Sequence, residues 1–183
     1  MSQTGSDAAA PVHRLRVVIV NASKHGSTIA IAGAIAQEMS ARGASVVVAE
    51  PDDDVDLAGA DVVIVASAVY LGRWMRSARR FVTRRGPELQ QCAVWLFSSG
   101  PVGDEPEPGL DPVQLERLMA QSGAVEHREF AGRLDMKSLG PIETLIATLA
   151  GASDGDRRDW TEVRTWAHRI LDVAQRSAAR EAR

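Results

Sequence analysis

Short apolar runs alternate along the chain with longer segments in which apolar residues recur every three or four positions. A short run rich in β-branched residues is typical of a strand buried on both faces, whereas the longer spacing indicates an amphipathic helix. The strands are expected at residues 15–20, 44–49, 61–66, 92–97 and 125–130. The helices are expected at residues 27–41, 73–85, 113–121, 139–150 and 160–176, the second of them closed by Gly86 and Pro87.

Strands that alternate with helices form right-handed βαβ units and a parallel sheet covered on both faces. Five strands predict an α/β three-layer sandwich with a five-stranded parallel sheet in the order 2-1-3-4-5. We expect one domain over residues 14–176, a disordered N-terminal arm at residues 1–13 and a frayed tail at residues 177–183. Ligands of such folds bind beyond the carboxyl ends of the strands, so the segments after strands one, three and four are the candidate sites.

The segment after the first strand, residues 21–28, reads NASKHGST and opens directly into a helix. Free backbone N–H groups and the helix dipole favour an anion at such a position. Ser23, Ser27 and Thr28 add hydroxyl donors, and Gly26 lets the backbone approach closely. The alternative is that Ser23 or Ser27 merely caps the helix. No P-loop string and no G-x-G-x-x-G string occurs in the chain, so the segment predicts a monophosphate site of another kind.

The other two segments are suited to a flat ring. Residues 67–74 contain Tyr70, the only tyrosine, and Trp74, which together could form one wall of a ring site; packing of both against helices is the alternative. Residues 98–103, with sequence SSGPVG, could read the edge of a heterocycle through backbone N–H and C=O groups, or form an ordinary surface loop.

Composition narrows the range of functions. The 183 residues carry 21 basic and 24 acidic side chains, a formal net charge of −3, which argues against a nucleic-acid binder. The single cysteine excludes an internal disulfide and a multi-cysteine metal site, and the four histidines lack ligand spacing, so no metal is expected. No apolar run approaches the length of a membrane span and no signal peptide is recognisable, which predicts a cytoplasmic protein.

Two other functions of the same strand–helix pattern can be tested against the residues. A phospho-receiver needs an acidic pair after the first strand and an aspartate at the end of the third, where Asn21-Ala22 and Ala66-Ser67 stand instead. A thiol phosphatase needs a cysteine that opens a phosphate loop, whereas Cys92 begins a strand expected to be buried, where a thiol is inert.

Arginine is concentrated in the helix after the third strand. All but two of the 21 basic residues are arginine, and six of them lie between residues 73 and 85. Guanidinium forks suit carboxylates. We therefore assign Arg73, Trp74, Arg76 and Arg80 to a surface for a substrate or partner, which includes peripheral association with an anionic membrane. A solvated helix face is the alternative interpretation.

The loop Ser-Lys-His-Gly-Ser-Thr resembles the Ser/Thr-x-x-Gly-x-Thr phosphate loop of flavodoxins. Residues 67–85, the loop after the fourth strand, and residues 151–155 and 159–160 resemble one branch of that family, the menaquinone-dependent protoporphyrinogen IX dehydrogenases. The similarity covers most of residues 15–172. It implies a flavodoxin-like fold and non-covalent FMN.

The resemblance also implies a set of cofactor-binding residues in the three segments. They are Ser23, Lys24, His25, Gly26, Ser27, Thr28, Ser67, Ala68, Val69, Tyr70, Ser98, Ser99, Gly100, Pro101, Val102 and Gly103. The sequence departs from many members in carrying Lys24 and His25 in the phosphate loop, and it lacks an aromatic residue after Gly100 that would stack on the flavin.

A more open flavin face favours an enzyme over an electron carrier, and it leaves room for a deazaflavin such as F420 in place of FMN. The expected function is an FMN-dependent oxidoreductase that passes electrons from an organic substrate to a quinone or a redox-protein acceptor. A flavodoxin-type carrier without its own substrate is the alternative. The catalytic residues, the substrate and the oligomeric state are not predicted.

Overall fold

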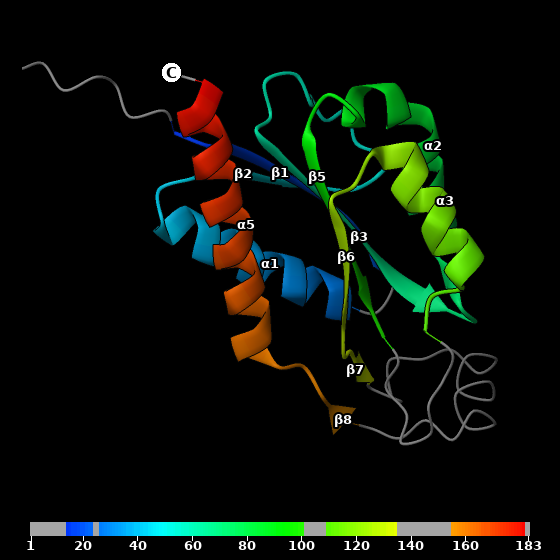
Figure 1. Cartoon of the computed structure of the whole chain (residues 1–183). Helices are drawn as coiled ribbons and strands as arrows, with labels where there is room; N and C mark the ends of the chain where they lie inside the picture. The colour runs from blue at the N-terminus through cyan, green and yellow to red at the C-terminus, as the bar shows by residue number, and fades with distance from the viewer. Residues whose placement is uncertain (1–13, 24–25, 101–108, 135–154, 182–183) are drawn as a thin grey trace, which may run out of the picture.

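The computed structural model describes residues 14–23, 26–100, 109–134 and 155–181. Its main sheet contains five parallel strands in the order β2-β1-β3-β5-β6, which confirms the predicted order (Figure 1). The strands are β1 (Arg16–Ala22), β2 (Ser45–Ala49), β3 (Val62–Tyr70), β5 (Ala93–Ser99) and β6 (Glu126–Phe130). A short strand β4 (Arg73–Trp74) pairs with β3 in the antiparallel direction, and β7 (Arg133–Leu134) pairs with β8 (Gly155–Asp156) in a separate sheet.

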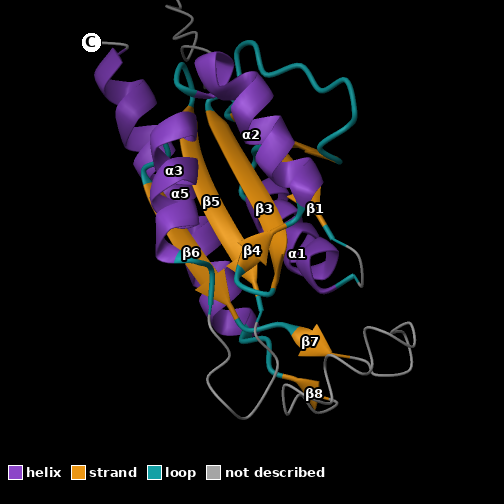
Figure 2. Cartoon of the chain, turned by 90° about the vertical axis from the view of Figure 1, so that its right-hand side faces the viewer, coloured by secondary structure: helices purple, strands orange, loops and turns teal. Residues whose placement is uncertain are grey.

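Helices cover both faces of this sheet, as the three-layer prediction requires (Figure 2). One face is covered by α1 (Ser27–Ala41) and α5 (Trp160–Glu181), whose buried residues share one core cluster. The other face is covered by α2 (Arg76–Leu89) and α3 (Pro112–Ser122), whose buried residues belong to a second cluster. The central strands are buried on both sides because each face has its own helical layer.

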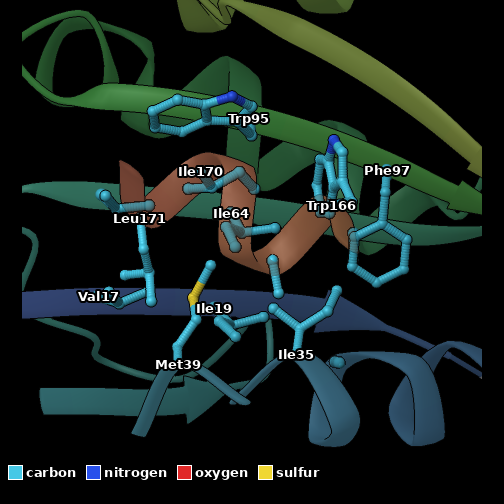
Figure 3. Close-up of a cluster of buried hydrophobic side chains, with 14 of the residues drawn as sticks. Val17, Ile19, Ile35, Met39, Ile64, Trp95, Phe97, Trp166, Ile170 and Leu171 are labelled. Carbon is cyan, nitrogen blue, oxygen red and sulfur yellow. The ribbon is translucent and has the colours of Figure 1, made fainter. Parts of the chain in front are cut away.

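Aromatic rings fill the core between the sheet and helices α1 and α5 (Figure 3). Phe97 of β5, Phe130 of β6 and Trp166 of α5 meet edge to face, with ring centroids 5.5 to 6.0 Å apart. This geometry sets the positive edge of one ring against the negative face of the next. Ile19 and Ile64 extend the same core across the middle of the sheet. Helix α5 is thus held against β5 and β6 by this packing, and ion pairs of Glu162 with Arg128 and of Arg169 with Glu126 join α5 to β6 at the surface.

The second strand–helix unit differs from its prediction. β3 continues to Tyr70 instead of ending at residue 66, because the chain turns at Leu71-Gly72 and returns as β4. Helix α2 therefore begins at Arg76 rather than at residue 73. It also runs through Gly86 and Pro87, where we expected it to stop. The turn after Pro87 is retained because it places the fully buried Leu89 in the core.

The C-terminal helix is longer than predicted. The apolar stripe of α5 ends at Ala174, but the helix continues to Glu181, so the expected frayed tail is helical over residues 177–181. Alanine and arginine in this stretch have high helix propensity, which is enough to extend a helix that packing has already nucleated. The predicted arm at residues 1–13 and the predicted helix at residues 139–150 lie outside the described residues.

Candidate functional site

The carboxyl ends of three strands meet at one edge of the main sheet. Ala22 of β1 is opposite Ser67 of β3, and Ser67 is opposite Ser98 of β5. The strand ends from which the three predicted segments start therefore lie side by side. Gly100 follows β5 at this edge, and its φ of +135° favours glycine at this position.

Helix α1 begins at this edge without a side-chain cap. Its N-cap residue is Gly26, with a left-handed φ of 84°, which has no side chain that could accept a hydrogen bond from the first turn. Ser23 Oγ instead accepts from the N–H of Gly26 itself, at 3.2 Å. The capping alternative is thus not what the structure shows. An uncapped helix start presents backbone N–H groups and a positive dipole end to an anion.

Thr28, in the first turn of α1, faces the protein interior. It is fully buried, and its Oγ1 lies 2.6 Å from Ser99 Oγ at the end of β5. In this structure the hydroxyl of Thr28 therefore bonds Ser99, and its contact with a phosphate stays a prediction. Asn21, at the end of β1, is 6% exposed, and its Oδ1 has no hydrogen-bond partner among the described residues. Such an orphaned buried oxygen is uncommon in a folded protein.

Trp74 is buried, which corrects its assignment to a ligand wall and to a partner surface. Only 1% of it is exposed, and its indole Nε1–H donates to Ser98 Oγ at 2.7 Å. Its backbone N–H donates to Oε1 of Gln114 at 2.8 Å, so β4 is attached to α3. The alternative, in which this ring packs under the helices, is confirmed because the β3–β4 turn sends it back toward the core.

Tyr70 and Leu71 remain at the surface beside that turn. Tyr70 is 40% exposed, and the burial of the rest of the side chain raises the pKa of its hydroxyl. Leu71 is 83% exposed and adopts φ 49°, the one positive φ among the described non-glycine residues. A β3–β4 tip of this kind is an apolar surface next to the strand ends.

The hydroxyls of Ser67 and Ser98 belong to the protein interior. Ser67 Oγ accepts from the N–H of Met75 at 2.9 Å and donates to the carbonyl of Ala68 at 2.8 Å. Ser98 Oγ bonds both Trp74 and His127. These contacts hold the connection from β4 to α2, and they leave only backbone groups of the two serines for a ligand.

His127 is a site residue that sequence reasoning missed. Its Nε2 lies 2.8 Å from Ser98 Oγ. Since the indole of Trp74 can only donate, the Ser98 hydroxyl is free to donate its proton to His127. Burial lowers the pKa of His127 to about 4, which keeps the ring neutral. The available signal was the alternation along β6, which places His127 on the opposite sheet face from Phe130.

The remaining predicted residues fall into two groups. Ala68 is buried and Val69 is half-buried, and both lie near the carboxyl end of β3. Lys24, His25, Pro101, Val102 and Gly103 lie outside the described residues.

Arg73 of β4 and the arginines of α2 lie on the outer surface, and α2 begins near the carboxyl end of β3. Arg73 and Arg76 are exposed, as expected. Arg76, Arg79, Arg80 and Arg84, with Thr83, line a hollow of about 410 Å³. Predicted surface residues Arg73, Arg76 and Arg80 are thus accessible, unlike Trp74.

Over the described residues there is no group of three His, Cys, Asp or Glu side chains that could hold a metal ion. Within the same part of the chain, no helix is long and apolar enough to cross a membrane. Cys92 is half-buried just before β5, and burial raises the pKa of its thiol, so the thiolate that a nucleophile requires is disfavoured.

Comparison with known proteins identifies the family and the fold of the chain. A family model described as a flavodoxin domain matches residues 18–159. No curated protein matches the chain. Three solved structures have the same fold. A flavodoxin from Archaea is 17% identical with a TM-score of 0.58, and the match covers 88% of this chain and 99% of that one; a short-chain flavodoxin associated with a PDU bacterial microcompartment is 14% identical with a TM-score of 0.58, and the match covers 87% of this chain and 99% of that one. Rubredoxin oxygen:oxidoreductase from Desulfovibrio gigas is 16% identical with a TM-score of 0.60, and the match covers 90% of this chain and 37% of that one.

Proposed function

Because the chain belongs to the flavodoxin-domain family, we propose that it binds FMN without a covalent bond and serves as a redox protein. The observation that carries this proposal is the uncapped start of α1 at Gly26, placed where the ends of β3 and β5 meet. This is an anion site beside a surface that a flat ring could use. FMN would match both features, because it carries a terminal phosphate and a tricyclic ring, joined by a ribityl chain that bears hydroxyl groups.

The residues at the strand ends fit such a cofactor. The phosphate would bind the N–H groups at the start of α1, next to Gly26. The ring would lie between the β3–β4 tip and the backbone that follows Ser99. The unpartnered Oδ1 of Asn21 lies below the same edge and is a ready acceptor for a hydroxyl. Bound FMN would supply hydride and single-electron chemistry, while the chain binds and orients it.

We favour an enzyme that takes electrons from an organic substrate and delivers them to a quinone or another acceptor. Two observations support this choice. The segment at residues 67–85 resembles that of protoporphyrinogen dehydrogenases, and Arg73, exposed at the β3–β4 turn outside the hollow of α2, suits a carboxylate group of a substrate. Substrate oxidation would then be followed by reoxidation of the flavin by the acceptor.

An electron carrier is the second candidate. Two of the structures with this fold are flavodoxins, and this chain covers 99% of each. A deazaflavin is the second candidate for the cofactor, since it presents a similar tricyclic ring to the same edge of the sheet.

Absorption spectroscopy of the purified chain tests the proposal. We expect flavin bands, and a chromophore released by heat whose mass is that of FMN; a deazaflavin would be recognised by its own mass. A protein that is colourless and cannot be reconstituted with either compound would contradict the proposal. Anaerobic mixing with protoporphyrinogen and then menaquinone separates the two functions, because only the enzyme reduces its flavin with the first and reoxidises it with the second.

A further inference from the structure

The outer side of α2 carries a groove lined with arginine. Arg76, Arg79, Arg80 and Arg84 follow one another at helical spacing and, with Thr83, line a hollow of about 410 Å³. We call these five residues the arginine groove. The opposite side of the helix is apolar and buried through Ala78, Phe81 and Val82. Packing therefore fixes the direction in which the arginines point, and they form one continuous face.

Acidic residues offset the positive charge of the arginines only in the second half of α2. Arg84 donates to the carbonyl oxygen of Pro51, and Arg85 donates to that of Val55 while pairing with Glu88. The hydrogen bond to Glu88 raises the pKa of Arg85, and the negative charge of Asp54 and Asp56, in the segment that supplies these carbonyls, raises it further. The carboxyl-terminal end of α2 is thus already paired within the chain.

In the first half of α2, no acidic residue offsets the positive charge of the arginines. Across the described residues, neither Arg76 nor Arg80 takes part in a hydrogen bond or an ion pair, and the guanidinium of Arg79 donates to the backbone carbonyl of Trp74. Arg76 is also the first residue of α2, the first turn contains no acidic residue, and no side chain caps it at Met75. Cations at the positive end of a helix dipole, and like charges four residues apart, are both unfavourable. A bound polyanion would relieve both.

We propose that the arginine groove docks an acidic segment of a partner protein. The groove spans about 12 Å from Arg76 to Arg84 by the helical rise, which is long enough for several carboxylates in a row. Guanidinium forks bind carboxylates in a bidentate manner, which suits aspartate and glutamate side chains. This inference rests on the proposed function in one respect: a redox function makes the partner the electron donor or acceptor.

The lining and shape of the groove favour an acidic protein segment over a small molecule and over a membrane surface. Small-molecule sites are lined mainly by apolar and aromatic side chains, whereas this groove is lined by four arginines and a threonine. Attachment to a bilayer uses large apolar side chains beside the basic ones; the groove itself contains none, and the exposed Tyr70 and Leu71 lie at the neighbouring β3–β4 turn rather than along the groove. A hollow also fits a protruding segment better than it fits a planar membrane surface.

The groove begins close to the proposed cofactor site. Arg73 pairs with Tyr70 across the β3–β4 turn, and α2 begins three residues after Arg73. The unbalanced end of the groove therefore lies next to the strand ends proposed to hold the cofactor. A segment docked there would bring its protein close to the edge through which electrons pass.

A labelled deca-glutamate peptide tests the proposal by fluorescence anisotropy with the full chain, at low and at high salt. The double variant Arg76→Glu/Arg80→Glu is compared with Arg176→Glu/Arg180→Glu, which reverses two exposed arginines with the same four-residue spacing on α5. We expect the groove variant to bind about tenfold or more weakly and the control to bind nearly as the parent does, with a strong salt dependence. The milder Arg76→Gln/Arg80→Gln variant, with circular dichroism of all variants, separates loss of binding from loss of folding.

Three outcomes would overturn the proposal: no peptide binding, equal loss in both double variants, or groove-dependent binding of phosphatidylserine vesicles without peptide binding. The last would assign the groove to a membrane. Each measurement is made with FMN present and with FMN removed. Peptide binding in a chain that never takes up FMN would contradict the redox function and leave the docking surface standing.

Discussion

Thr28 Oγ1 and Ser99 Oγ lie 2.6 Å apart and join the first turn of α1 to the last residue of β5. The bond connects two segments that are 71 residues apart in the chain, both at the edge of the sheet proposed to hold the cofactor. Since both hydroxyls are buried, the pair positions the anion-binding end of α1 relative to the end of β5.

Removing one hydroxyl of this pair should leave the other unpaired and buried. We expect Thr28→Val or Ser99→Ala to lower the free energy of unfolding by about 1–3 kcal/mol, because the remaining hydroxyl loses its partner without regaining water. The double variant should cost less than the sum of the two, since neither polar group then remains. Urea unfolding of the four proteins measures this, and strict additivity would show that the hydroxyls do not interact.

Gly26 and Gly43 provide a matched pair for testing the anion site. Both have a left-handed φ, 84° and 89°, and a Cβ at either would meet nothing within 4 Å. Alanine should therefore cost each a similar backbone strain, of about 1 kcal/mol. Only Gly26→Ala alters the start of α1, so we expect it alone to weaken FMN binding, measured by fluorescence titration. Equal affinities in the two variants would place the phosphate elsewhere.

The buried His127 should make stability depend on pH. Its pKa is about 4 in the folded chain against 6.5 for an ordinary histidine, so between these values the unfolded chain binds more protons. Unfolding free energy should then fall as the pH drops from 6.5 toward 4, by about 2 kcal/mol after allowing for its partial exposure. His127→Gln removes this group, and the difference between the two pH profiles of urea unfolding isolates its part. Parallel profiles would mean that His127 titrates normally.

Leu71 offers a change that should stabilise the chain. It is 83% exposed, so little packing is lost on its replacement, yet its φ of 49° is unfavourable for a branched side chain. Leu71→Asn should raise the free energy of unfolding by about 0.5–1 kcal/mol because asparagine tolerates this conformation. Leu71→Ala, which keeps most of the strain, is the control. If Leu71 covers the ring, the asparagine variant will also bind FMN less tightly.

The apolar runs and the segments that follow them in the sequence were enough to predict the strand order and to locate the candidate site. The apolar runs that become β1, β3 and β5 are each buried on both faces, and this burial is why they are continuous in sequence. Once the sheet is parallel, the segments after these strands must meet at one edge. The loop before α1 was recognisable because its hydroxyl residues and glycine are neighbours in the sequence.

The directions of the side chains at that edge were decided by tertiary structure. Trp74 was expected at the surface, and it is buried because the turn at Leu71-Gly72 folds β4 back against β3. Ser98 bonds Trp74 and His127, which are 24 and 29 residues away. Sequence determines which segments are apolar and which can turn. It does not reveal which buried donor meets which acceptor, because each such pair forms only after packing has removed water from both partners.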